Sequence, residues 1–167
     1  SVEHREVLKK QSGGRGKFAD IIFEIGPADE TWLTENPGKS YQFVNDLFGG
    51  SIPKEFVPAI NKGFETSMHS GVLASYPMVN MKVRVFDGSY HDVDSDAMSF
   101  ELCAKGGFRE AGRKAKPTLL EPIMKVEVVV PDKFMGDITG NLSSKRGAIE
   151  SITDRANLKV ILAKVPL

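Results

Sequence analysis

Apolar and polar residues recur along the chain at the spacings of strands and helices. Residues 2–10 and 18–25 flank the glycine-rich segment 11–16, which predicts a strand, a hairpin loop and a second strand. Residues 26–40 carry prolines, glycines and asparagines, so we expect a surface connection there, followed by a short strand at 41–46. The chain is therefore predicted to open with β-structure.

A helix is predicted after Pro53, since four apolar side chains recur at steps of three and four residues: Val57, Ile60, Phe64 and Met68. Gly71 can close this helix in a left-handed cap. This apolar stripe is expected to pack on a sheet.

Residues 78–86 alternate between apolar and polar side chains, which predicts a half-buried strand that ends in a turn at Asp87-Gly88. A second helix is expected at about 96–114, capped by Asp94 or Ser95 and stopped by Pro117. A second loop thus joins a strand to a helix.

The pattern of apolar and polar residues changes after residue 116. Residues 123–130 read as a strand, 132–145 as a helix, and 149–153 and 158–165 as two further strands, so the unit is β-α-β-β. A split β-α-β domain needs another helix and strand to complete its sheet. We therefore predict an α+β chain whose second unit is poorly ordered or pairs with another copy through its open edge.

The composition excludes several classes. The 22 basic residues balance 22 acidic ones, so net charge gives no reason to expect a nucleic-acid partner. Cys103 is the single cysteine, which excludes an internal disulfide framework. No stretch approaches the roughly 20 apolar residues that span a bilayer, and the charged opening residues 3–6 do not resemble a signal peptide. We expect a cytoplasmic protein with no membrane partner.

The loop from Gln11 to Lys17 is glycine-rich and lies among lysines and an arginine, a setting that suits a phosphate of a small ligand or of RNA. It is not a Walker A loop, because it leads into a strand and not a helix. A tight hairpin turn with solvated charges explains the same pattern.

An acidic cluster follows the second loop, with His91 before it: Asp92, Asp94 and Asp96. It fails the calcium-loop test, because alanine stands where that loop requires glycine. Capping of a helix start explains the aspartates better, and we predict no metal. His91 is either an idle surface residue or a group that donates to phosphate or stacks on a base.

Four cations recur along the second predicted helix and share one stripe if the helix stays regular that far: Lys105, Arg109, Arg113 and Lys116. Such a stripe can follow an RNA backbone, although solvated lysine-rich faces are common and Glu110 can neutralise part of it. Cys103 falls among apolar neighbours, the setting of an inert buried thiol, so no catalytic residue is assigned.

Several strings closely resemble elongation factor G, a family of translational GTPases, in order and with compatible gaps. They are His4-Arg5-Glu6, Gln11-Ser12-Gly13-Gly14-Arg15-Gly16, Tyr41-Gln42-Phe43-Val44-Asn45-Asp46, Gly49-Gly50-Ser51-Ile52-Pro53, Gly88-Ser89-Tyr90-His91-Asp92-Val93-Asp94-Ser95, Lys114-Ala115-Lys116-Pro117, Leu120-Glu121-Pro122-Ile123-Met124-Lys125-Val126-Glu127 and Met135-Gly136-Asp137. The resemblance extends over almost the whole chain.

This resemblance implies that residues 1–116 are domain IV, a ribosomal-protein S5 domain 2-like fold with a left-handed β-α-β crossover, against the usual handedness. Residues 117–167 would be a partial, ferredoxin-like domain V. The family hydrolyses GTP, with Mg, in a G domain that is absent here, so the resemblance implies no cofactor and no catalysis for this fragment. It implies the ribosome as partner, with small-subunit RNA, tRNA and mRNA at domain IV and the large subunit at domain V.

In the family, two loops at the tip of domain IV enter the decoding region during translocation of tRNA and mRNA. By matching motifs, the RNA-contacting residues are Ser12, Gly13, Gly14, Arg15, Gly16, Lys17, Ser89, Tyr90, His91 and Asp92. Shape and 2′-hydroxyl contacts suit that role better than base reading.

Two departures from the family pattern stand out. Lys17 follows the glycine loop where many relatives carry glutamine, and Gly106-Gly107 interrupts the second helix at a cost of about 1 kcal/mol for each glycine. Both leave a divergent paralogue or a ribosome-protection relative as alternatives. A stand-alone enzyme that uses phosphate or metal is the alternative of another class.

Overall fold

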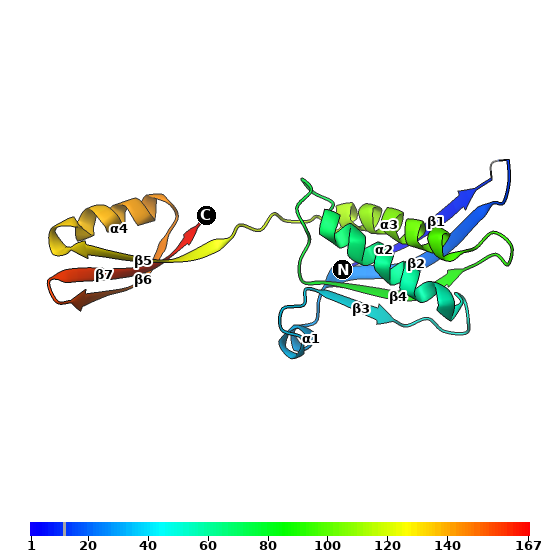
Figure 1. The fold of residues 1–167 in the computed structure, drawn as a ribbon, viewed down its shortest axis with the longest axis horizontal. Helices are drawn as coiled ribbons and strands as arrows, with labels where there is room; N and C mark the ends of the chain where they lie inside the picture. Colours follow the sequence, from blue (N-terminus) through cyan, green and yellow to red (C-terminus); the bar gives the residue numbers. More distant parts are fainter. Residues whose placement is uncertain (12) are drawn as a thin grey trace. The chain divides into compact units, whose positions relative to one another are not determined.

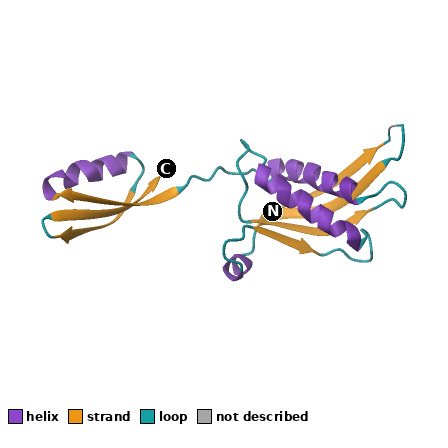
Figure 2. Ribbon diagram, viewed as in Figure 1, coloured by secondary structure: helices purple, strands orange, loops and turns teal. Residues whose placement is uncertain are grey.

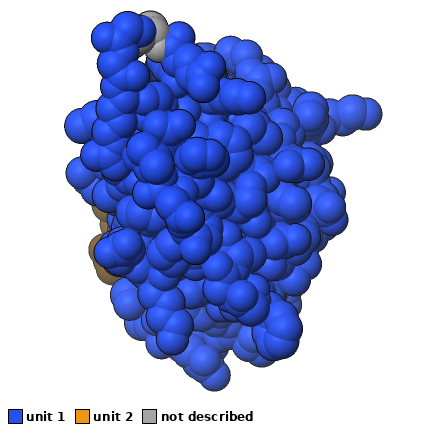
Figure 3. Space-filling model, turned by 90° about the vertical axis from the view of Figure 1, so that its right-hand side faces the viewer, with its two compact units in different colours: residues 1–117 blue, residues 118–167 orange. Residues whose placement is uncertain are grey.

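The computed structural model describes residues 1–11 and 13–167. The chain forms two compact units, Ser1–Pro117 and Thr118–Leu167 (Figures 1 and 3). Each unit has its own hydrophobic core.

Unit 1 contains a four-stranded sheet of order β1-β2-β4-β3. Its strands are β1 (Val2–Lys10), β2 (Lys17–Pro27), β3 (Tyr41–Asn45) and β4 (Met81–Ser89). The pairs β1/β2 and β2/β4 are antiparallel, whereas β3 and β4 are parallel. The predicted glycine hairpin is confirmed, since Lys10 pairs with Lys17 at its base.

One face of this sheet is covered by two helices, α2 (Val57–Ser70) and α3 (Ala97–Lys114), as Figure 2 shows. A single 3-10 turn, η1 (Lys54–Phe56), precedes α2. The largest fully buried side chains are aromatic and come from both layers: Phe23, Phe64, Phe100 and Phe108. Three of the four predicted stripe residues of α2, Ile60, Phe64 and Met68, are buried in the core, which confirms that part of the stripe. Val57, at the start of the helix, is only half-buried.

A short helix, α1 (Glu30–Glu35), lies in the segment predicted to be a connection without helix. Asp29 has extended backbone at its start, and Asn36 closes it by donating to the Trp32 carbonyl oxygen at 2.9 Å. None of the α1 residues is buried. The prediction missed this helix because it has only six residues, none of them buried, and so shows no apolar periodicity.

The predicted turn at Asp87-Gly88 is wrong, because β4 continues through both residues to Ser89. The register against β2 shifts by one residue, so that Val85 faces Phe23 while Asp87 faces Ile22. Gly88 is required inside the strand, since a Cβ atom there would lie 2.6 Å from the Ile52 side chain. The register shift leaves Phe86 without a partner on β2, so the irregularity of the strand lies just before the predicted turn.

Two predicted helix ends need correction. The cap of α3 is Asp96, whose carboxylate accepts from the Ser99 backbone N–H at 2.7 Å, and neither Asp94 nor Ser95. Gly71 closes α2 with φ 68° as expected, but its ψ of 175° is extended and not left-handed helical. The chain turns there directly into the segment that leads to β4.

Unit 2 follows the predicted β-α-β-β order. Its elements are β5 (Ile123–Pro131), the 3-10 turn η2 (Asp132–Phe134), α4 (Met135–Ser144), β6 (Ala148–Arg155) and β7 (Leu158–Pro166). The sheet order is β5-β7-β6, with both pairs antiparallel. A small core joins Leu142 of α4 to Ile161, Ala163 and Val165 of β7.

Candidate nucleic-acid interface

Three loops lie at one end of the unit 1 sheet, at the right of Figure 1 and facing the viewer in Figure 3. They are the β1–β2 hairpin (11–16), the β4–α3 loop (90–96) and the β3–η1 loop (46–53). The strand directions cause this, because β4 runs parallel to β3 and antiparallel to β2. The sequence predicted the first two as contact loops and missed the third, whose position depends on a parallel pairing.

Two hydrogen bonds to backbone carbonyl groups tie the hairpin and the start of β2 to the β4–α3 loop. The Arg15 guanidinium donates from Nε to the Val93 carbonyl oxygen at 2.9 Å, and the Phe18 N–H donates to the Asp94 carbonyl oxygen at 2.8 Å. Gly13 has φ 52°, which favours glycine in this turn. Ser12, a predicted contact, lies outside the described residues. The two predicted tip loops are thus brought together.

His91 is held by its backbone and leaves its ring to solvent. Its N–H donates to Ser95 Oγ at 2.9 Å, and that hydroxyl donates to the Phe18 carbonyl oxygen at 2.7 Å. The imidazole is 60% exposed and lies 3.8 Å from an Asp94 carboxylate oxygen. The loop therefore fixes the backbone of His91 and presents an exposed imidazole that can donate to an acceptor or stack on a base.

A hollow of about 180 Å³ adjoins this histidine. Its lining residues are Lys9, Lys10, Gln11, Lys17, Phe18, His91 and Asp94. Three lysines and one carboxylate are among these lining residues, so the surroundings of the hollow carry a local excess of positive charge that attracts a backbone phosphate. The lysines that flank the glycine loop in the sequence thus lie around this hollow, as the setting of that loop predicted.

Of the three aspartates after His91, Asp96 has a structural role, since it caps α3. Hydrogen bonds from Ser99 hold the pKa of Asp96 below its ordinary value, as expected for a helix cap. Within residues 1–11 and 13–167, no three histidine, cysteine or acidic side chains gather to hold a metal ion.

The predicted cationic stripe on α3 is shorter than expected. Helix α3 ends at Lys114, and Lys116 beyond it has a non-helical φ of 53°. Lys116 is therefore not on the same helix face as the other three cations. Lys105 pairs with Glu101 at 2.6 Å and Arg113 pairs with Glu110 at 3.3 Å. These carboxylates neutralise much of the stripe that was predicted to follow an RNA backbone.

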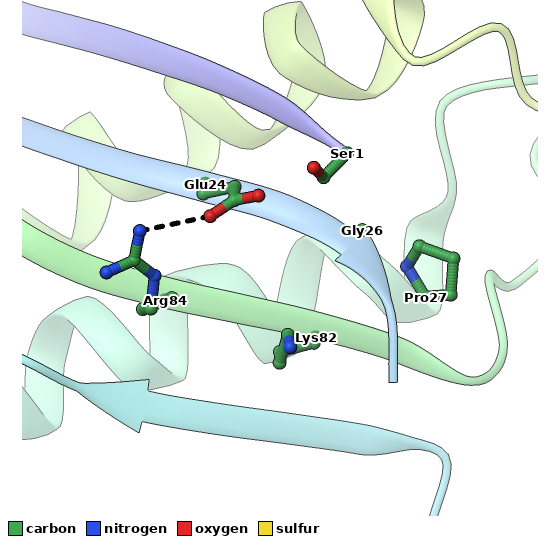
Figure 4. Close-up of a pocket in the computed structure, with 6 residues that line it drawn as sticks. All are labelled: Ser1, Glu24, Gly26, Pro27, Lys82 and Arg84. Atoms are coloured by element: carbon green, nitrogen blue, oxygen red, sulfur yellow. Dashed lines mark hydrogen bonds and ion pairs between the residues drawn. The ribbon is translucent and has the colours of Figure 1, made fainter. Parts of the chain in front are cut away.

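A larger hollow of about 340 Å³ lies beside β2 and β4 (Figure 4). Its charged groups are already paired: Arg84 contacts Glu24 at 3.1 Å and Asp46 at 3.3 Å, and Lys82 pairs with Asp29. Because its cations have carboxylate partners, this hollow offers an anion little attraction.

Cys103 is buried, as predicted. Burial raises the pKa of its thiol to about 12, and Sγ lies 3.3 Å from the Glu6 carbonyl oxygen. A thiol in this setting stays protonated and unreactive at neutral pH.

The architecture defines a two-module chain, a loop-bearing α+β unit followed by a small antiparallel sheet with a helix. Residues 1–116 match the family described as elongation factor G, domain IV, and residues 118–167 match the elongation factor G C-terminus. The chain belongs to the elongation factor G family. These two matches leave no segment of this chain for a GTP-binding domain.

Curated relatives support this assignment. The chain is 52% identical over its whole length to elongation factor G of Amoebophilus asiaticus and, equally, to that of Cytophaga hutchinsonii. It spans 23% of each of those proteins. A crystal structure from Thermus thermophilus superposes with a TM-score of 0.83 at 34% identity, covering 99% of this chain and 24% of that one.

In the part of the chain that the structure describes, no helix combines the length and the apolar character needed to cross a membrane.

Proposed function

We propose that this chain is the part of a translational elongation factor that enters the small-subunit decoding region and contacts RNA while tRNA and mRNA move. The observation that carries the proposal is the His91 loop, which is tied to the glycine hairpin and presents an exposed imidazole beside three lysines. Both loops belong to the segment that matches domain IV.

Positively charged and hydrogen-bonding groups at this end match what an RNA helix displays. A-form RNA exposes phosphates and 2′-hydroxyls across its shallow groove, and these accept from lysine, arginine and imidazole donors irrespective of sequence. We therefore assign backbone contact to Arg15, Lys17 and His91, with the remaining tip residues Gly13, Gly14, Gly16, Ser89, Tyr90 and Asp92 shaping the surface. The tip acts by occupying space beside the codon–anticodon helix.

We infer finer fold and domain assignments from the same resemblance. The parallel β3-α2-β4 connection supports a ribosomal-protein S5 domain 2-like unit with a left-handed crossover. The proposed domain boundary at residues 116–117 lies one residue before the division between the compact units, which follows Pro117. The β5-β7-β6 order supports a ferredoxin-like domain V directed to the large subunit. GTP hydrolysis would belong to another domain of a longer factor.

Replacing His91 with alanine tests the proposal. In a reconstituted assay with the full-length factor, we expect tRNA movement to slow by about fivefold, the worth of one hydrogen bond, while ribosome-stimulated GTP hydrolysis is unchanged. The matched control is His69→Ala, an exposed histidine near the end of α2. Unchanged movement in the His91 variant would count against the assignment.

We also propose that this fragment self-associates through unit 2. Among the described residues, no strand pairs with the outer edge of β5, and Val129 on that strand is 42% exposed. An open apolar edge recruits another strand. Light scattering of the fragment is expected to show dimers, which Val129→Lys should return to monomers. A strict monomer whose unit 2 amides are fully protected from exchange would contradict the idea.

A further inference from the structure

We propose that Phe48, on the β3–η1 loop, is a third RNA contact of unit 1, an aromatic platform on which an unpaired base stacks. The inference rests on the proposed function, because it takes RNA as the partner at this end. It adds a loop and a mode of contact that the two predicted tip loops do not provide.

Phe48 is displayed by a loop that is anchored on both sides. Its side chain is 90% exposed, while Ile52 four residues later is only 2% exposed and belongs to the core. On the other side, the Asp46 N–H donates to the Val85 carbonyl oxygen at 2.8 Å. Exposing an apolar ring to water is unfavourable, so a partner that covered the Phe48 ring would bind with a favourable change in hydration free energy.

The backbone after Phe48 takes a path that favours glycine. Gly49 has φ 68° and Gly50 has φ 74°, and the Ser51 N–H lies 3.5 Å from the Phe48 carbonyl oxygen. Two successive residues with positive φ turn the chain sharply and leave no side chain beside the ring. The ring can therefore be approached on its face.

The loop is continuous with the proposed RNA-contacting end. Ile52 packs next to Gly88 of β4, since a Cβ atom at Gly88 would lie 2.6 Å from its side chain. Gly88 is three residues from His91, and Tyr90 between them is 42% exposed. The Phe48 loop therefore packs beside the end of β4, the strand that leads into the His91 loop.

The setting favours a base over a protein partner. A stable protein interface buries roughly 1,000 Å² or more of surface in total, far more than a single side chain offers. Phe48 is instead bordered along the chain by small or polar residues, Asp46, Gly49, Gly50 and Ser51, with Leu47 half-buried. A single exposed ring is enough for one unpaired base to stack on, and such stacking contributes about 1–3 kcal/mol to binding.

Binding of the end-labelled 167-residue chain to purified small ribosomal subunits tests the inference. Phe48→Ala is expected to weaken binding by about tenfold, and Phe48→Trp to preserve it, because stacking needs a π-face. Phe48→Leu, which keeps the apolar volume, should bind as weakly as the alanine variant. The matched control is Tyr76→Ala, an aromatic residue with 64% exposure in the segment that precedes β4, away from the three loops.

The outcomes separate this inference from the proposed function. If His91→Ala weakens binding and Phe48→Ala does not, the third contact is wrong while the RNA role of the tip stands. Wild-type affinity in the Phe48→Leu variant would overturn base stacking in favour of an apolar protein contact. If neither His91→Ala nor Phe48→Ala changes binding, both proposals fail.

Discussion

Replacing Asp20 with asparagine is expected to lower the free energy of unfolding of unit 1 by about 2 kcal/mol at neutral pH, the worth of charge-assisted hydrogen bonds to a buried group. Asp20 is 2% exposed, although it points away from the helices. Its carboxylate accepts from Arg5 Nε at 2.9 Å, Arg5 Nη2 at 2.8 Å and Ser89 Oγ at 2.7 Å. One side chain thus joins three strands, β1, β2 and β4.

The effect of this substitution should depend on pH. Burial alone would raise the pKa of Asp20, but the hydrogen bonds from Arg5 and Ser89 outweigh it and hold the pKa below its ordinary value. A carboxyl group with a depressed pKa stabilises the fold above its unfolded pKa of about 3.9 and loses that contribution as pH falls through the folded value. The difference between wild type and variant should therefore vanish in acid.

Urea unfolding followed by tryptophan fluorescence measures this change, because Trp32 is the only tryptophan and lies in unit 1. The matched control is Glu24→Gln on the same strand, whose partner Arg84 is half-exposed. Exposed ion pairs contribute about 0.5 kcal/mol, so this control should unfold almost as the wild type does. Equal losses in the two variants would refute the special role of Asp20.

Gly107→Ala is expected to destabilise unit 1 by about 1 kcal/mol, the overpacking cost less the gain in helix propensity. A Cβ atom there would lie 2.8 Å from the Phe23 ring and 2.9 Å from Glu6 Cβ, so the helix must move away from the sheet. Overpacking of this kind costs about 1–3 kcal/mol, of which the better helix propensity of alanine returns at most about 1 kcal/mol. Trp32 fluorescence during urea unfolding again reports the change.

The neighbouring glycine is the control. At Gly106 the nearest atom to an added Cβ is a Glu6 carboxylate oxygen at 3.4 Å, on a side chain that can move. Gly106→Ala should therefore stabilise α3 by up to about 1 kcal/mol. Destabilisation by both variants, or by neither, would show that helix–sheet distance does not select glycine at position 107.

These glycines show where sequence reasoning fell short. The pair was predicted to interrupt the second helix, yet α3 runs unbroken from Ala97 to Lys114. Propensity counts the cost of Gly107 within the helix, whereas its benefit is the close approach of Phe23 from another element. That contact cannot be read from neighbours along the chain.

The predictions for the candidate site also differ in outcome, according to whether local residues or helix continuity decided them. The glycine hairpin and the His91 loop were predicted from local turn residues and family motifs, and the structure brings them together. The cationic stripe was predicted from spacing alone, and it failed at Lys116 because the helix ends at Lys114. Residues spaced three or four apart share one face only while the helix that carries them continues.

By itself, the sequence determined the order of most strands and helices, the glycine hairpin and the apolar stripe of α2, since each follows from residues close together in the chain. The tertiary structure alone decided that the Phe48 loop joins the tip, that Asp20 is buried on the open face, and that Asp87 and Gly88 continue β4. These features depend on strand pairing and helix–sheet packing between distant segments. A local hydrophobic period carries no information about such partners.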